Sequence, residues 1–284
     1  MTVVLVFLIR GVQDLFLVQF KAQMESVFTQ TELVSELRLA LRNNSGELPN
    51  TLPELADEPF LLLPGHYLVV SRNVEAVMQQ YMASNRSAFL QMRNMPTLTR
   101  TSGRLVLLDR SRHVIDEVHY DSRQHADFLN LANGVSLERI NPDHNSLDPA
   151  NWHTAAQTAG FATPGKQNSQ YMELAGTTAS EVSVSPEVFS PDNDGIDDFL
   201  SINYRFNTPA LTGEVIIFDS SGRIIKNLVS QQLLSTEGTF IWDGSDNNGR
   251  KALTGIYIIF FQAYNSQGVQ KIYKIPCVLA GYRR

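Results

Sequence analysis

The sequence predicts an all-β protein made of two consecutive β-sandwich domains. The chain has 284 residues, which is too long for one typical sandwich and long enough for two. Its second half consists of short alternating apolar and polar runs separated by turn residues, the pattern of half-buried strands. Only one segment, near residues 73–82, has helical periodicity instead.

The composition indicates a globular protein without a nucleic-acid partner. Hydrophobic residues make up 43% of the chain, enough to build cores, and the formal net charge is −6. A protein that binds the phosphate backbone of a nucleic acid needs a basic surface, and no run of Lys or Arg occurs in the sequence. Cys277 is the only cysteine, so an intrachain disulfide is excluded, and its apolar neighbours predict a buried position within a strand.

The N-terminal segment, residues 1–34, has no clear domain assignment. Its apolar run at 2–9 lacks the preceding positive charge and the small-residue cleavage site of a secretory signal. Arg10 follows too early for a transmembrane helix, so no transmembrane segment is expected. We interpret 3–9 as a first strand, in a region where the opening strands of the first domain are degraded or missing.

The first domain is predicted to span residues 35–170. A buried strand at 67–70 precedes the helix at 73–82, for which Ser71 or Asn73 provides the N-cap. The apolar stripe of this helix lies at positions i, i+3, i+4 and i+7, which are Val74, Val77, Met78 and Tyr81. Two apolar runs, 104–109 and 113–120, are separated by a short polar stretch and predict a hairpin.

A stretch rich in Ala, Gly, Thr and Ser at 171–180 predicts a linker, and a second sandwich is expected at 181–284. Seven short strands at this spacing are typical of an immunoglobulin-like sandwich. The predicted strands are 182–185, 200–206, 214–218, 223–229, 239–242, 255–264 and 269–279.

Ordered motifs in the second half carry a family resemblance. They are the stretches 189–198, 217–225, 242–249 and 255–257. In order and spacing they resemble the Ig-like domain of flagellar hook-capping proteins and the C-terminal domain of gliding motility-associated proteins of the Bacteroidetes. The resemblance implies export to the outer cell surface or beyond it.

The first half resembles the bacterial form of the lamin-tail domain, itself an Ig-like sandwich. The residues that carry this resemblance are 63–67, 103–109, 114–116, His125, 134–142, 151–152 and 162–169. Near 13–19 the sequence departs from the acidic, aromatic opening segment of that family.

Four carboxylates lie close together around Gly195 and form the candidate metal site: Asp192, Asp194, Asp197 and Asp198. Calcium takes six to eight oxygen ligands, and closely spaced carboxylates on a glycine-containing loop can supply them. The alternative is that these residues serve as turn formers that bond their own backbone. No other cofactor is expected.

No catalytic constellation is present, so no enzymatic activity is expected. The sequence has no H-E-x-x-H, G-x-S-x-G or G-x-G-x-x-G motif. The stretch 160–167 approaches a phosphate loop, but Gln167 replaces the hydroxyl that would hold magnesium and Pro164 removes a backbone N–H.

These observations predict a non-catalytic structural or interaction module of a secreted or cell-surface bacterial protein. Its expected partners are other domains or proteins of the cell envelope. The alternative is a module for calcium-dependent adhesion or carbohydrate binding that was once attached to a hydrolase. Trp152 and Trp242 would serve sugar binding only if they faced solvent, and their surroundings favour packing.

Overall fold

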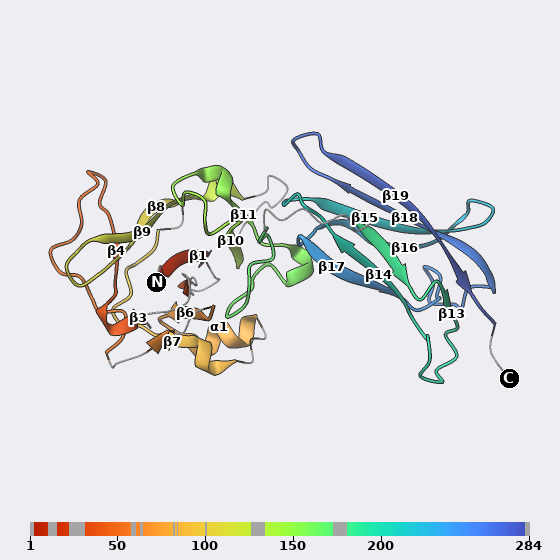
Figure 1. Ribbon diagram of the computed structural model, residues 1–284, viewed down its shortest axis with the longest axis horizontal. Helices are drawn as coiled ribbons and strands as arrows, with labels where there is room; N and C mark the ends of the chain where they lie inside the picture. Colours follow the sequence, from red (N-terminus) through yellow and green to blue (C-terminus); the bar gives the residue numbers. More distant parts are fainter. Residues whose placement is uncertain are drawn as a thin grey trace, which may run out of the picture. The chain divides into compact units, whose positions relative to one another are not determined.

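The computed structural model describes residues 3–10, 16–22, 32–57, 61–62, 65–81, 83, 85–99, 101–125, 134–172 and 181–281. Strands dominate and one α-helix is present among these residues, which confirms the all-β prediction (Figure 1). None of the helices in this part of the chain is long and apolar enough to span a membrane. Most of the predicted linker lies outside the described residues.

The chain divides into two compact units. The first unit comprises Met1–Ala155 and Ala159–Tyr171, and the second comprises Ala156–Thr158 and Met172–Arg284. The first unit therefore includes the N-terminal segment to which the sequence assigned no domain.

A six-stranded sheet forms the centre of the first unit, in the order β11-β10-β1-β2-β6-β7. Its strands are β1 Val3–Arg10, β2 Phe16–Ala22, β6 Tyr67–Ser71, β7 Phe89–Gln91, β10 Val135–Arg139 and β11 Trp152–Thr154. Neighbouring strands are antiparallel except β6 and β7. The two strands of the N-terminal segment thus occupy the middle of this sheet.

A three-stranded sheet packs on one side of the six-stranded sheet. It consists of β4 Arg38–Leu41, β8 Ser102–Leu108 and β9 Val114–Asp121, and β8 and β9 form the predicted hairpin. A short pair, β3 Glu32–Leu33 and β5 Leu61–Leu62, completes the strands of this unit. The core between the two sheets includes Leu39, Leu68, Val70, Leu105, Leu107, Val118, Leu137 and Trp152.

Helix α1, Val74–Gln80, belongs to a second apolar cluster, which it forms with the other side of β6. The Asn73 side chain caps it by accepting a hydrogen bond of 3.1 Å from the Ala76 N–H, which decides between the two N-caps that the sequence predicted, Ser71 and Asn73. The cluster comprises Val69, Val74, Val77, Ala88, Phe89 and Ala162, with Met78 and Tyr81 partly buried against it. With cover on both faces, every residue of β10 is buried.

The second unit is a sandwich of a three-stranded and a five-stranded sheet, in the orders β12-β14-β17 and β13-β19-β18-β15-β16. Its strands are β12 Val182–Ser185, β13 Val188–Phe189, β14 Leu200–Arg205, β15 Thr212–Asp219, β16 Ile224–Leu233, β17 Glu237–Trp242, β18 Gly255–Tyr264 and β19 Gln270–Leu279. All seven predicted strands are present. The sequence missed β13, because two residues are too few to show an alternation.

Aromatic side chains fill the core between these two sheets. Trp242 lies with its ring centroid 5.2 Å from that of Phe189 and 5.0 Å from that of Tyr257. Cys277 is buried within β19, as predicted, and burial raises the pKa of its thiol to about 12. It is therefore a packing residue and not a reactive thiol.

Three turns of the second unit share one hydrogen-bond pattern. They begin at Asp219, Asp246 and Asn265, and in each the side-chain oxygen accepts the N–H groups two and four residues later. The fourth residue is a glycine with positive φ in all three. The turn clusters in the sequence are explained by this geometry, because glycine adopts positive φ without steric cost.

Candidate functional site

The acidic loop between β13 and β14 brings three of the four predicted metal ligands together. Carboxylate oxygens of Asp192, Asp194 and Asp198 lie within 4.8 Å of one another. Asp197 is not part of this group, and its backbone carbonyl accepts a hydrogen bond of 2.9 Å from the Ser190 N–H. The structure therefore supports a grouping of three carboxylates and separates the fourth from them.

The same carboxylates are engaged by the backbone of their own loop. Asp198 accepts hydrogen bonds from the N–H groups of Asn193 and Gly195, at 2.6 and 2.9 Å. Asp194 accepts one from Ile196 at 2.8 Å. These are the local bonds that make Asp a turn residue, and they explain the residue types without a metal. Calcium binding at this loop stays a prediction.

A second oxygen-rich turn, at 243–249, closes onto the edge of the five-stranded sheet. Asn247 donates its N–H to the Ile225 carbonyl and accepts the Asn227 N–H with its side chain, at 3.0 and 2.9 Å. The ammonium group of Lys226 forms an ion pair of 3.3 Å with the carboxylate of Asp243. These contacts hold the turn against β16 and cover part of an exposed strand edge.

Both tryptophans are buried. Trp152 and Trp242 are 3% and 0% exposed. Their indole N–H groups donate to the carbonyls of Ser146 and Ser245, at 2.8 and 2.9 Å. Neither side chain can stack on a sugar ring, so neither supports the carbohydrate-binding alternative.

In the first unit, buried charges hold the 134–142 motif in place. Glu138 accepts hydrogen bonds of 2.7 Å from the hydroxyls of Thr163 and Ser169, and burial raises the pKa of its carboxyl. Arg139 forms an ion pair of 2.9 Å with Asp116 of β9. The Glu138 contacts fasten the 160–170 segment to β10. The stretch that approached a phosphate loop is thus part of the packing of this unit.

One end of the outer face of the five-stranded sheet is apolar, which the sequence reasoning missed. Because successive side chains of a strand point to opposite faces, Tyr257, Ile259 and Phe261 of β18 point into the core and their neighbours point outward. We call the outward residues at this end of the sheet the outer apolar face, and they are Val188, Phe218, Ile224, Ile256, Ile258 and Val278.

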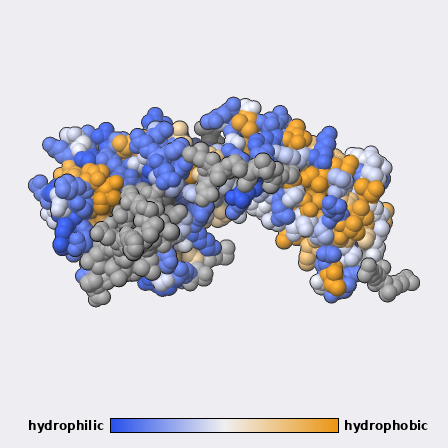
Figure 2. Space-filling view, in the orientation of Figure 1, coloured by the Kyte–Doolittle hydropathy of each residue, from blue (hydrophilic) through white to orange (hydrophobic). Residues whose placement is uncertain are grey.

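The residues of the outer apolar face lie in adjacent rows across the strands. Val278 pairs with both Val188 and Ile256, and Ile258 pairs with Phe218. Val188, Ile224 and Ile256 are 52%, 53% and 56% exposed. Apolar side chains also gather on the visible surface of the second unit (Figure 2). A contiguous exposed apolar patch of this kind marks an interaction surface in many proteins.

Sequence comparison gives one family match. Residues 183–275 match the family described as the CHU_C type IX secretion signal domain. No curated protein matches the chain. The match runs from β12 into β19, so it covers most of the second unit. It agrees with the resemblance to C-terminal domains of the Bacteroidetes, whereas the lamin-tail and hook-capping resemblances stay predictions.

Structure comparison gives distant similarities. FlgD from P. aeruginosa is 18% identical, covers 35% of this chain and 70% of its own, and has a TM-score of 0.26. Dimeric latent PorU from Porphyromonas gingivalis is 13% identical over 97% of this chain, with a TM-score of 0.29. PorZ of the same organism is 13% identical over 97% of this chain, with a TM-score of 0.24. The chain spans 19% of the PorU structure and 38% of the PorZ structure.

Proposed function

We propose that the second unit is a type IX secretion signal, a folded and non-catalytic sandwich that directs the chain to the cell surface or the medium. The observation that carries this proposal is the family match over residues 183–275. In this proposal the partner is the secretion machinery of the cell envelope, and the first unit is delivered as cargo.

The features of the second unit fit a signal that is recognised as a folded domain. Its turns are held by hydrogen bonds within each loop, and its aromatic core is closed. Its acidic loop and its tryptophan are explained by local bonding and packing. The outer apolar face remains as the surface through which we propose that the machinery recognises the domain, because exposed apolar area is what a partner can bury.

The proposal is tested by expressing the full chain behind an added Sec leader in a Bacteroidetes strain with type IX machinery and in a matched strain without it. We expect the chain at the surface or in the medium of the first strain and in the periplasm of the second. A variant that ends at residue 180 should stay in the periplasm of both. The same location of the full chain in both strains would overturn the proposal.

A further inference from the structure

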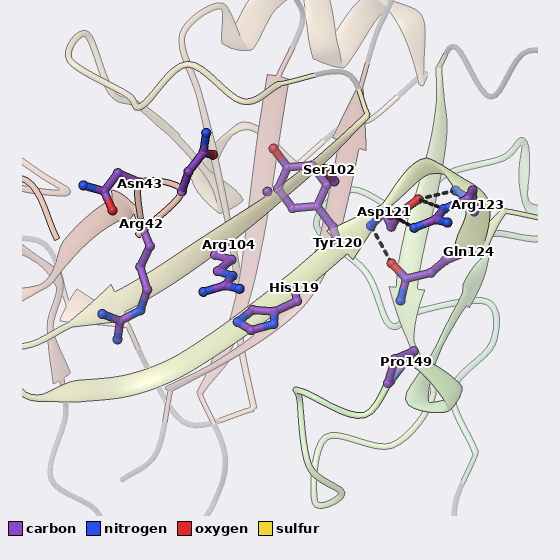
Figure 3. Close-up of a pocket in the computed structure, with 12 residues that line it drawn as sticks. Arg42, Asn43, Ser102, Arg104, His119, Tyr120, Asp121, Arg123, Gln124 and Pro149 are labelled. Carbon is purple, nitrogen blue, oxygen red and sulfur yellow. Dashed lines mark hydrogen bonds and ion pairs between the residues drawn. The ribbon is translucent and has the colours of Figure 1, made fainter. Parts of the chain in front are cut away.

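The first unit contains a cavity of about 760 Å³, open to solvent, beside its three-stranded sheet (Figure 3). Leu105 and Val118 point into the core, so the alternation of β8 and β9 turns Arg104 and His119 to the opposite face, where the cavity lies. Arg42, directly after β4, and Arg123, after β9, also line it. Three arginines therefore line this one cavity, although the formal net charge of the chain is −6.

Two of these arginines are fixed by carboxylates. Arg42 donates to both oxygens of Glu117 at 3.0–3.1 Å and to the Gly46 carbonyl at 3.0 Å. Arg123 donates to both oxygens of Asp121, at 3.0 and 2.7 Å. These pairs neutralise the two guanidinium groups and hold them in place.

Arg104 is the third arginine of this cavity. Its backbone carbonyl accepts the Arg42 N–H at 2.9 Å, and His119 lies directly opposite it on β9. Figure 3 shows its side chain between those of Arg42 and His119. Within the described part of the chain, its guanidinium takes part in no hydrogen bond or ion pair that meets the usual distance limits. Its donors therefore remain available to a ligand.

We propose that this cavity binds an acidic sugar, with Arg104 donating two parallel hydrogen bonds to the carboxylate or phosphate group of the ligand. The fork of a guanidinium matches the two oxygens of such a group, and the bond is charge-assisted. Ser102 lines the same cavity and offers its hydroxyl to a sugar, whereas the side chain of Asn43, which also lines the cavity, is bonded to Glu47. The volume exceeds the need of an inorganic ion, which favours a ligand that carries the charge on a larger polar body.

The test is calorimetric titration of the full chain at low ionic strength with glucuronate, glucose 6-phosphate, inorganic phosphate and glucose. We expect both acidic sugars to bind and glucose not to bind. The variant Arg104→Gln should weaken the binding of the acidic sugars roughly tenfold or more, because it removes the charge and the paired donors. Inorganic phosphate should compete with them more weakly than either sugar.

The matched control is Arg205→Gln, which removes an exposed arginine from the second unit. It should leave the binding of both acidic sugars unchanged. The melting temperature of each variant confirms that it is folded. The proposal is overturned if neither acidic sugar binds, if glucose binds equally well, if phosphate competes as strongly as the sugars, or if Arg104→Gln binds like the parent chain. This outcome is independent of the secretion role.

Discussion

The two units differ in how many faces of their largest sheet are covered by other elements. In the first unit, the six-stranded sheet has the three-stranded sheet on one face and an apolar cluster containing α1 on the other, so β10 is buried at every position. In the second unit, β18 alternates between buried and partly exposed residues, and the outward residues of its first half, Ile256, Ile258 and Phe260, are apolar as well. An apolar strand can therefore mean a covered sheet or an apolar face that is left open to solvent. Only the packing of the other elements separates the two.

The largest expected effect is the loss of a buried ion pair that ties the first unit together. Arg139→Met leaves the Asp116 carboxylate, 8% exposed, without its ion pair. We expect the first unit to lose about 3–5 kcal/mol of unfolding free energy. Urea unfolding measures this in a Trp242→Phe background, where Trp152 is the remaining tryptophan.

The matched control is Arg205→Met, which removes an ion pair with Glu237 in which both side chains are more than 60% exposed. It should change the stability of the second unit by less than about 1 kcal/mol. Equal losses in the two variants would contradict the distinction between a buried and an exposed ion pair.

A smaller effect is expected where a tyrosine lies over a glycine of the neighbouring strand. A Cβ at Gly238 would lie 2.4 Å from the hydroxyl of Tyr204. Gly238→Ala should therefore destabilise the second unit by about 1–3 kcal/mol. In Gly255→Ala the new Cβ meets no atom within 4 Å, so the change should be close to zero. Urea unfolding in a Trp152→Phe background compares the two, and a similar result for both would refute the packing argument.

Acid should weaken the first unit through a buried histidine. Burial, with a contribution from His153, lowers the pKa of His125 to about 4. The unfolded chain takes up this proton near pH 6.5 and the folded unit only near pH 4, so stability is complete above pH 6.5 and falls between these values. The raised pKa of Glu138 has the opposite effect, because it makes the folded unit more stable as the pH falls.

We expect a loss of roughly 2–3 kcal/mol attributable to His125, measured as the difference between the parent chain and His125→Gln in urea unfolding from pH 7 to pH 4. Parallel curves for the two proteins would show that this histidine does not titrate as described.

The smallest effect is expected from calcium. Since the acidic loop already satisfies its carboxylates with backbone N–H groups, calcium chloride should shift the melting temperature by less than about 1 °C and release no heat of binding. A rise in melting temperature that disappears in Asp192→Asn would instead establish the calcium site.

The sequence predicts the second unit well because its information is local. Each strand alternates, and turns such as Asp219 to Gly222 repeat one hydrogen-bond pattern, so boundaries follow from neighbouring residues. The first unit depends on pairings between distant segments. Nothing near residue 3 indicates that β1 lies between β2 and β10, and nothing near Glu138 indicates that Thr163 and Ser169 will bind it.

The candidate sites also differ in whether their residues are close together in the sequence. The carboxylates around Gly195 are close in sequence and were found together, with the exception of Asp197. The outer apolar face and the Arg104 cavity combine side chains from several strands, and register is needed to see them. The apolar outward positions of β18 were the one available signal, because a strand with one wet face should be polar there.

The most direct measurement of recognition by the second unit compares two isoleucines in secretion. Ile256 on the outer apolar face and Ile241 on the three-stranded sheet are 56% and 57% exposed, so glutamate at either position should leave the fold intact. In a strain with type IX machinery, Ile256→Glu should hold the full chain in the periplasm, whereas Ile241→Glu should be secreted like the parent chain. Secretion of both variants at the parental level would contradict recognition through this face.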